Sequence, residues 1–371
     1  MKIEKKKEKK LNLIKLFLAS FLILSAPIRA QDFLDVKLPP GFQLELFMDS
    51  VPGARSIVQS RDGVFYVGTR EKQVYRLSDT SGDARPDKLQ ILIKDLNMPN
   101  GVAIKDGDLY IAEVNRILRI RDVEKNYRSP KPEIFFDQLP SETWHGWKFI
   151  AFGPDENLYI PIGAPCNVCN PKLPYASIHR LNLKTKKLEM IAQGVRNSVG
   201  FDWDPQTKEL WFSDNGRDMM GDEMPPCELN HLKKVGENFG FPFCHGGVFQ
   251  DTEFKLKSCT EFKAPAQNLG PHVAPLGIHF YRGKMFPKEY QNQIFIAEHG
   301  SWNRKDPLGY RVSLVRLDKS RKPVSYESFL DGWLRGRSPV ARPVAFWELI
   351  DGSLLISDDH GGRIFRLSYK K

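Results

Sequence analysis

Four of the eight histidines lie beside short apolar segments, in polar surroundings that could support proton transfer. They are His145 in WHGW, His272 in PHVAP, His299 in AEHG and His360 in DDHGG. Chance placement in loops would scatter the histidines more widely along the chain. Imidazole is the side chain whose ordinary pKa suits acid–base work at neutral pH. His145 is therefore the candidate general base.

Arginine and asparagine side chains also lie beside short apolar segments, as the four histidines do. They are Arg196 and Asn197 in VRNS, Arg304 in WNRK, and Arg342 in ARPV. Guanidinium forms paired hydrogen bonds to carboxylate or phosphate, so this set suits a small polyanionic ligand. The segment DNGRDMMGDE (214–223) gathers four acids with Gly and Asn. That composition suits Ca²⁺ bound partly through backbone carbonyls, although the acid spacing is not that of an EF-hand.

Each of these residues also has a purely structural interpretation. A histidine in a loop is commonly solvated or caps a turn, and Arg196 with Asn197 could tie two loops together through backbone carbonyls. Asp358 and Asp359 could satisfy the N–H groups of a turn. The functional interpretation depends on whether these groups lie together in one pocket.

A repeat along the chain predicts that they do. Six segments combine a polar turn, a strand with a bulky centre, a loop and often a second strand. Their centres are Tyr66, Tyr110, Tyr159, Trp211, Phe295 and Leu355, separated by 44, 49, 52, 84 and 60 residues. A four-stranded blade takes about 40–50 residues. The sequence predicts an all-β fold, a single six-bladed β-propeller over residues 31–371, with a loop-rich insertion around 217–285. Equivalent loops of every blade would then meet at one end of the axis.

The net charge of +10 is unevenly distributed. Residues 1–30 hold eight Lys and Arg against two Glu, which leaves a surplus of only four for residues 31–371. No basic stripe with interleaved aromatic residues and no nucleic-acid-binding module is present in the sequence. A nucleic-acid partner is therefore not expected.

The N-terminal segment has the pattern of a secretory signal. A lysine-rich stretch precedes the apolar run LFLASFLILSA (16–26) and a small residue at Ala30. Eleven residues are too few to span a bilayer, which takes roughly 20. Residues 1–30 are predicted to be a signal peptide, with an uncleaved anchor as the alternative. The mature protein is expected to be periplasmic or secreted, without stable membrane insertion after cleavage.

Five cysteines fit an oxidising compartment. Cys166 and Cys169 form one close pair, and Cys244 and Cys259 flank a polar loop. Either pair could form a disulfide, which leaves Cys227 without a partner. Asn170 stands where a c-type haem motif needs His, so the first pair is not a haem site and its expected role is structural.

Several long motifs, in the same order along the chain, resemble the glucose/sorbosone dehydrogenase family. They are WHGWKFIAFGPDENLYIPIGAPCNVC (144–169), VRNSVGFDWDPQTKELWFSDNGRD (195–218), NFGFPFCHG (238–246), HVAPLGIHFY (272–281), AEHGSWNR (297–304) and SDDHGGRIFRLSY (357–369). Members of that family are six-bladed propellers that depend on pyrroloquinoline quinone (PQQ). The sorbosone-dehydrogenase-like branch is the most similar, and the resemblance covers about residues 35–370.

The resemblance implies roles for individual residues. His145 would take the proton of a sugar hydroxyl while hydride passes to PQQ, and Arg196 with Asn197 would hold the quinone oxygens. The carbonyls of Gly216 and Arg217 would bind Ca²⁺. The remaining cofactor contacts would come from His272, His299, Arg304 and Arg342. The sequence thus predicts a PQQ- and Ca²⁺-dependent dehydrogenase acting on an aldose or a sugar aldehyde.

Three positions depart from the glucose enzyme of that family. Val199 replaces a Gln, Gly270 replaces a Trp, and His299 stands where that enzyme uses a cofactor-binding Lys. Specificity for glucose is therefore not carried over. Two alternatives stay open, a Ca²⁺-dependent lactonase and a non-catalytic binding propeller. With no c-haem motif in the sequence, a dehydrogenase of this kind would pass its electrons to a separate acceptor.

Overall fold

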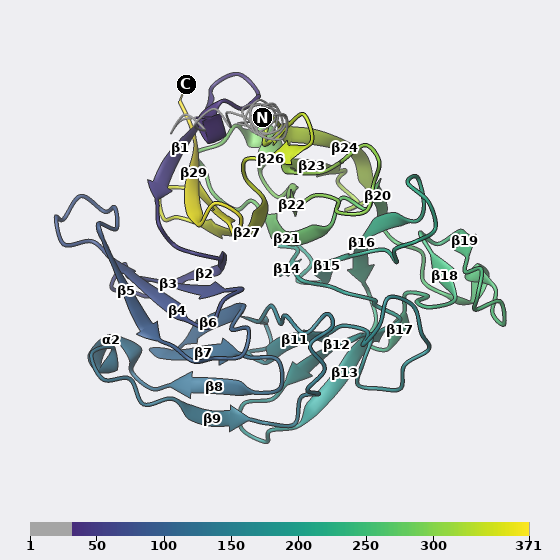
Figure 1. The fold of residues 1–371 in the computed structure, drawn as a ribbon, viewed down its shortest axis with the longest axis horizontal. Coiled ribbons are helices and arrows are strands. Elements are labelled where there is room, and N and C mark those ends of the chain that lie inside the picture. The colour runs from purple at the N-terminus through teal and green to yellow at the C-terminus, as the bar shows by residue number, and fades with distance from the viewer. Residues whose placement is uncertain (1–31, 371) are drawn as a thin grey trace, which may run out of the picture. The chain divides into compact units, whose positions relative to one another are not determined.

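Six sheets, each built on four antiparallel strands, stand around a central axis in the computed structural model, which describes residues 32–370 (Figure 1). The prediction of an all-β, six-bladed propeller is confirmed. The predicted signal peptide at 1–30 lies outside the described residues. Among residues 32–370, the only α-helix is the single turn α2 (Val123–Asn126).

Each blade is a four-stranded meander that runs from an innermost to an outermost strand. Blade one contains β2 (Ala54–Gln59), β3 (Phe65–Thr69), β4 (Val74–Ser78) and β5 (Lys88–Ile93). Blade two contains β6 (Gly101–Lys105), β7 (Asp108–Ala112), β8 (Ile117–Ile120) and β9 (Glu133–Phe136). Blade three contains β10 (Ala151–Phe152), β11 (Leu158–Ile162), β12 (Ser177–Leu181) and β13 (Leu188–Gln193).

The second half of the ring follows the same plan. Blade four contains β14 (Phe201–Trp203), β15 (Leu210–Asp214), β16 (Pro226–Leu232) and β20 (Gln267–Pro271). Blade five contains β21 (Pro275–Phe280), β22 (Ile294–Glu298), β23 (Arg311–Leu317) and β24 (Pro323–Leu330). Blade six contains β27 (Pro343–Glu348), β28 (Leu354–Asp358), β29 (Arg363–Tyr369) and β1 (Phe42–Met48).

The six centres of the sequence repeat all fall in the second strand of a blade. These strands are β3, β7, β11, β15, β22 and β28. In a propeller both faces of a blade pack against neighbouring blades, so an inner strand is buried on both sides. Every residue of β3, β11, β15, β22 and β28 is buried, which explains why each of these strands begins with three large apolar residues.

The ring is closed by strand pairing between the two ends of the propeller. β1 forms the outermost strand of blade six and pairs antiparallel with β29, from Phe42 opposite Tyr369 to Met48 opposite Ile364. A single sheet therefore joins the first and the last strand of the fold. The phenyl ring of Phe42 lies edge-on to Phe286, Tyr290 and Phe329 of blade five, which seals this junction with aromatic packing.

The insertion is narrower than the predicted range of 217–285. It comprises residues 233–266 between β16 and β20, with the short strands β17 (Glu237–Asn238), β18 (Cys244–His245) and β19 (Phe249–Gln250). β17 pairs in parallel with β13, so the insertion of blade four extends the outer edge of blade three (Figure 1). The repeat spacing revealed extra length between two blade centres but not its position, because that interval also contains three regular strands and their loops.

Glycine allows the innermost strands to approach one another closely at the axis. A Cβ on Gly101 of β6 would lie 2.4 Å from the backbone oxygen of Lys148, and one on Gly277 of β21 would lie 2.6 Å from that of Val344. Both contacts are with backbone of the next blade, which cannot rotate out of the way. Glycine is therefore required at these positions by packing.

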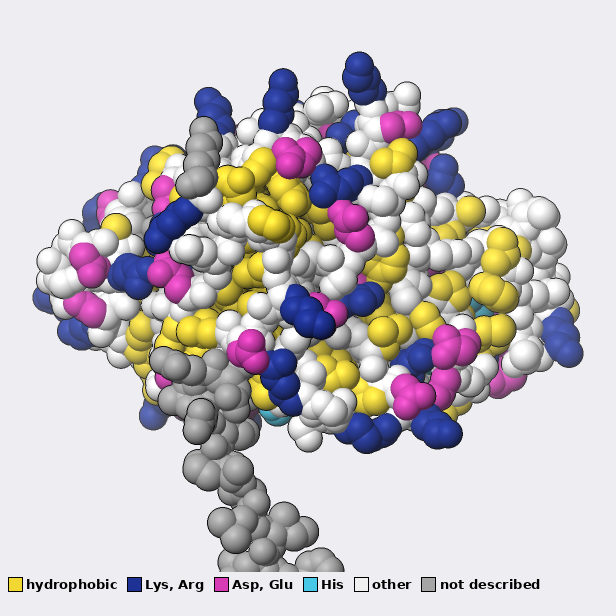
Figure 2. Space-filling model, turned by 90° about the horizontal axis from the view of Figure 1, so that it is seen from above, with side chains coloured by type: hydrophobic (Ala, Val, Ile, Leu, Met, Phe, Trp, Pro, Cys, Tyr) yellow, Lys and Arg dark blue, Asp and Glu magenta, His cyan; other side chains and the backbone are white. Residues whose placement is uncertain are grey.

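Charged side chains of both signs are interspersed on the face shown in Figure 2 rather than gathered by sign. This agrees with the small charge surplus of residues 31–371. Within residues 32–370, no helix has the length and apolar character needed to cross a bilayer.

Candidate functional site

Two kinds of loop meet at one end of the axis, which we call the upper mouth. In an antiparallel meander, the loop before each innermost strand and the loop between the second and third strands lie at the same end. All nine predicted site residues fall in such loops: His145, Arg196, Asn197, Gly216, Arg217, His272, His299, Arg304 and Arg342. The fold therefore brings these loops together, although the side chains point in different directions.

His145 precedes β10 and is held in one orientation. Its backbone is left-handed, with φ of 51°, and Nδ1 lies 2.8 Å from the carbonyl oxygen of Ala164. Because a carbonyl only accepts hydrogen bonds, Nδ1 carries the proton and Nε2 of the neutral ring keeps its lone pair. Burial lowers the pKa of His145 to about 3, and the nearby charge of Arg196 adds to that shift. The imidazole is thus neutral at physiological pH and can accept a proton.

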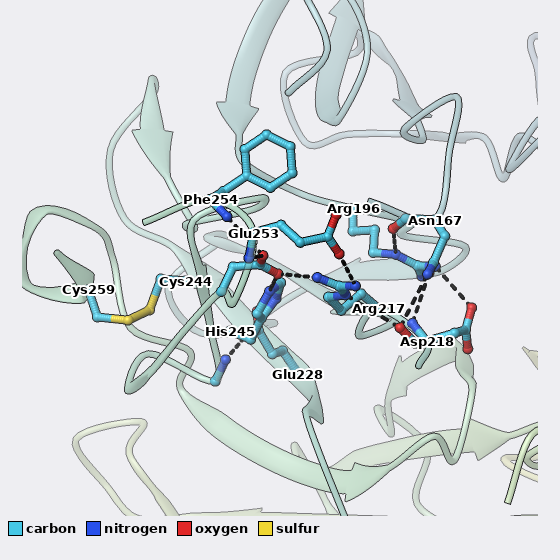
Figure 3. A network of polar contacts seen from close by, with 12 residues as sticks. Asn167, Arg196, Arg217, Asp218, Glu228, Cys244, His245, Glu253, Phe254 and Cys259 are labelled. Atoms are coloured by element: carbon cyan, nitrogen blue, oxygen red, sulfur yellow. Dashed lines mark hydrogen bonds and ion pairs between the residues drawn. A yellow bond between two sulfur atoms is a disulfide. The ribbon is translucent and has the colours of Figure 1, made fainter. Parts of the chain in front are cut away.

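Arg196 connects two loops of the upper mouth. Its Nε and Nη2 donate to the carbonyl and side-chain oxygens of Asn167, each at 2.9 Å, and Nη1 donates to the carbonyl of Asn215 at 3.1 Å. Nη2 also lies 3.2 Å from Asp218 (Figure 3). Most contacts of the Arg196 guanidinium therefore agree with the structural interpretation, in which this residue holds loops together.

The CNVCN motif has a structural role at the same point. Cys166 and Cys169 form a disulfide around Asn167, the residue that receives Arg196. Asn167 also accepts the backbone N–H of Asp218 at 2.9 Å. The expectation that both cysteine pairs could close is confirmed, since Cys244 and Cys259 are bonded as well, and Cys227 is free and buried.

Asn197 lies next to His145. A Cβ on Gly163 would lie 2.5 Å from Cβ of His145 and 3.4 Å from Oδ1 of Asn197, so both side chains border the same glycine. The turn is fixed by Asp214, which accepts the backbone N–H groups of Arg196 at 2.8 Å and Asn197 at 2.6 Å. Burial, and then the neighbouring Glu228, raise the pKa of Asp214 to about 8.

Arg217 turns away from the axis. Its Nη1 lies 2.6 Å from Asp251 and its Nη2 2.8 Å from Glu253, both in the insertion (Figure 3). His245 of β18 lies 2.9 Å from the same Asp251. The side chain of Arg217 thus anchors the insertion, and only its backbone could serve a metal ion as predicted.

His272 and Arg304 brace the loop that contains Gly216 and Arg217. Nε2 of His272 lies 2.8 Å from the carbonyl of Gly221 and 3.0 Å from that of Met224. The guanidinium of Arg304 donates to the carbonyl of Asp222 and lies 2.7 Å from Glu223. The imidazole of His272 and the guanidinium of Arg304 therefore both bind residues of the loop between β15 and β16.

The four acids of the 214–223 segment do not converge. Asp214 caps the Arg196 turn, Asp218 bonds Arg196 and Asn303, and Glu223 pairs with Arg304. Asp222 accepts the backbone N–H of Lys305 at 3.0 Å. No group of three or more His, Cys, Asp and Glu placed to hold a metal ion occurs among residues 32–370.

His299 and Arg342 belong to a second group of polar residues at the upper mouth. Nε2 of His299 lies 2.7 Å from Oδ1 of Asp359. Arg342 donates from Nε to the carbonyl of His299 at 2.9 Å and from Nη2 to that of Gly300 at 2.7 Å. Burial lowers the pKa of His299 to about 4, although Asp359 opposes the shift. Burial alone would raise the pKa of Asp359, but His299 and Arg55 hold it well below its usual range.

Arg55 is the principal residue of this group that the sequence interpretation missed. It lies on β2, is fully buried, and donates from Nη1 to Asp359 at 2.7 Å and from Nε to Asn100. Its guanidinium carbon lies 4.5 Å from the ring centre of Trp147. Nη2 is buried and has no hydrogen-bond partner among the described residues. The signal that the sequence offered was an arginine inside the strand segment ARSIVQ (54–59).

Arg70 adds a further positive charge beside the same carboxylate. Its Nη1 lies 3.7 Å from Oδ2 of Asp359, and its guanidinium carbon lies 5.4 Å from the ring centre of Trp147. Burial lowers the pKa of Arg55, and the charges of Arg70 and Arg342 lower it further against the opposing effect of Asp359. We call the three arginines Arg55, Arg70 and Arg342 around Asp359, together with the neutral His299, the cationic cluster.

A cavity of about 1000 Å³ opens at the opposite end of the axis. Its walls combine aromatic side chains, among them Phe152, Phe201, Trp203 and Trp347, with charged and polar ones. The histidine in its wall, His279, is engaged between two carboxylates, 3.5 Å from Asp202 and 3.0 Å from Glu348. None of the predicted site residues lines this cavity.

Comparison with known proteins places the chain in a family. Residues 57–364 match the family described as "Domain of unknown function (DUF7133)". The chain belongs to this family. An uncharacterised protein of Borreliella burgdorferi is 39% identical to this DUF7133 protein over 368 residues, which cover 95% of this chain and 96% of the relative.

Solved structures of a carbohydrate-active enzyme and of a pyranose dehydrogenase domain share the fold of this DUF7133 protein. A calcium structure of a Trichoderma reesei enzyme of carbohydrate-active family AA12 has a TM-score of 0.79 at 22% identity, covering 90% of this chain and 97% of that one. The PQQ domain of pyranose dehydrogenase from Coprinopsis cinerea, in its holo form, has a TM-score of 0.76 at 16% identity with the same coverage of the two chains. In sequence, the Coprinopsis enzyme matches at 30% identity over 122 residues, 27% of this chain and 16% of that enzyme. The resemblance to PQQ-dependent propellers is confirmed in the fold, while the sorbosone branch stays a prediction.

Proposed function

We propose that this protein is an exported PQQ- and Ca²⁺-dependent dehydrogenase that oxidises an aldose or a sugar aldehyde. The observation that carries the proposal is the arrangement of the upper mouth. A neutral His145 with an available Nε2 lies at the same end of the axis as the cationic cluster, whose buried Arg55 has an unpartnered nitrogen. The solved PQQ-domain structure with the same fold supports this interpretation.

The cationic cluster fits a cofactor that carries several carboxylates. Arg55, Arg70 and Arg342 surround the ionised carboxylate of Asp359, and the neutral His299 adds no charge, so the cluster has an excess of positive charge. Leaving a buried guanidinium N–H unpaired is unfavourable by about 1–3 kcal/mol, which an anionic oxygen would recover. We infer that Arg55, Arg70 and Arg342 hold the carboxylates of PQQ. His299 would be positioned by Asp359, and Asn197 would contact the cofactor beside His145.

The backbone carbonyls of Gly216 and Arg217 remain suitable as the predicted Ca²⁺ ligands. Among residues 32–370, nothing donates a hydrogen bond to the carbonyl oxygen of Gly216 or Arg217. Backbone carbonyls are ordinary Ca²⁺ ligands. The contacts of His272 and Arg304 hold the loop that presents these two carbonyls, so we propose positioning roles for both side chains.

The residues of the chain account for the proton part of the reaction. When bound, PQQ with its Ca²⁺ supplies the two-electron acceptor for the hydride that leaves the substrate carbon. Nε2 of His145 accepts the proton of the hydroxyl group bound to that carbon, so the C–O bond becomes a carbonyl as hydride leaves, and the Nδ1 hydrogen bond to Ala164 keeps the tautomer that makes this possible. The positive charge of Arg196 disfavours protonation of the ring before substrate binds.

A direct test combines binding with turnover. The purified protein is titrated with PQQ at millimolar Ca²⁺ by absorbance and calorimetry, and then assayed for reduction of an artificial electron acceptor with a panel of sugars and aldehydes. Saturable binding with sugar-dependent reduction is the expected result. Binding without turnover would favour a non-catalytic propeller, and hydrolysis of a lactone panel without PQQ would favour a Ca²⁺-dependent lactonase. Either outcome refutes the proposal.

A further inference from the structure

Exposed apolar side chains surround the upper mouth. Four of them are more than half exposed: Trp144 (54%), Leu173 (58%), Met219 (70%) and Trp302 (70%). Trp144 lies in the loop that joins blades two and three, and the other three lie in loops of blades three, four and five. Large apolar side chains that stay exposed close together on a surface are typical of sites that bind a ligand or partner. Trp144 differs from the other three because of its neighbour.

Trp144 stands directly beside the candidate base. The ring centres of Trp144 and His145 lie 5.9 Å apart, with the planes 77° from one another. The imidazole is fixed by its hydrogen bond to Ala164, so the exposed indole lies at a defined place relative to Nε2. An aromatic face and a proton-accepting nitrogen are therefore available to one ligand at once.

This pair of groups indicates the chemical class of the ligand. One face of a pyranose ring presents C–H bonds that are apolar and weakly positive, and the face of an indole is weakly negative. The ring also carries hydroxyl groups at its edge that can donate to an imidazole nitrogen. An apolar ligand would leave Nε2 unpaired, and a small open-chain aldehyde would cover little of the indole.

We propose that Trp144 forms a carbohydrate-stacking subsite that selects substrates in the closed pyranose form. The inference rests on the proposed function, because it assigns the substrate of that same site. Trp144 is a substrate-positioning residue. It holds the sugar ring so that a hydroxyl faces Nε2 of His145, and it takes no part in proton transfer.

Kinetics with two substrates test the subsite. Trp144→Ala should raise KM for a pyranose about tenfold, equivalent to about 1.4 kcal/mol of binding free energy. Its kcat should stay within about twofold of the parent protein. Its KM for glyceraldehyde, which cannot form a pyranose, should not change. Ile134→Ala is the matched control, since Ile134 is 57% exposed on the outer strand of blade two. An unchanged KM for the pyranose, or an equal rise for glyceraldehyde, would overturn the proposal.

Tryptophan fluorescence provides a readout that does not require turnover. Titration of the protein with a pyranose should change its emission, the change should persist in Trp302→Phe, and it should disappear in Trp144→Phe. A change that survives in Trp144→Phe would place the sugar elsewhere. If no variant shows PQQ-dependent turnover but the Trp144-dependent change is present, the proposed function fails while the subsite stands.

Discussion

The protonation state of His145 gives a quantitative prediction. Its pKa is lowered to about 3 in the folded protein, against about 6.5 in an unfolded chain. Between these two values the unfolded state binds a proton that the folded state does not. Falling pH therefore favours unfolding, and the stability that this residue contributes is complete above pH 6.5 and is lost below it.

The size of the effect follows from the same linkage. Each pH unit within that window changes the free energy of unfolding by about 1.4 kcal/mol for one such group. Lowering the pH from 7 to 5 should remove about 2 kcal/mol through His145 alone. His299 and other buried histidines add to the total loss, so the contribution of His145 must be isolated by comparison with a variant that does not titrate there.

His145→Asn is the appropriate comparison. Asparagine tolerates the left-handed backbone at this position, where φ is 51°, and it carries an amide in place of the ionisable ring. Urea unfolding at pH 7 and pH 5 should show the parent protein losing about 2 kcal/mol more than the variant. Equal losses in the two proteins would show that the imidazole is not held neutral, and would refute the assignment of its environment.

Four further results are expected. His145→Ala should abolish sugar-dependent turnover and leave the affinity for PQQ, measured by calorimetry, within about threefold; retained turnover would contradict the base assignment. Arg55→Met should weaken PQQ binding by roughly 10- to 100-fold, the value of a charge-assisted hydrogen bond, whereas Arg61→Met at the opposite end of the axis should not. Replacing Cys244 and Cys259 by Ser should lower the free energy of unfolding by about 3 kcal/mol for a loop of 15 residues, and an unchanged denaturation midpoint would contradict this. Gly101→Ala should destabilise the ring by about 1–3 kcal/mol, because the new Cβ would meet the backbone oxygen of Lys148; unchanged thermal unfolding would argue against the close approach.

The fold was predictable from the sequence because its strongest signal is local and repeated. The segments around Tyr66, Tyr110 and Tyr159 each carry the continuous apolar character of a strand buried on both faces, and each is followed by a turn. The repeat gave the number of blades and the end at which their loops meet. It could not place the insertion at 233–266, because the residues of the insertion do not follow the repeat. Strand β17, for example, pairs with β13 of the preceding blade.

The sequence by itself determined which loops form the upper mouth and which residues they carry, His145 among them. Only the tertiary structure decided where those side chains point. Arg304 was predicted from the sequence to contact the cofactor, yet its guanidinium is bound by the carbonyl of Asp222 and the carboxylate of Glu223. Arg55 lies within strand β2 and becomes part of the cationic cluster only through its contact with Asp359, 304 residues away. Hydrogen bonding between distant loops depends on distances that the folded chain alone establishes, so residue type and spacing cannot settle it.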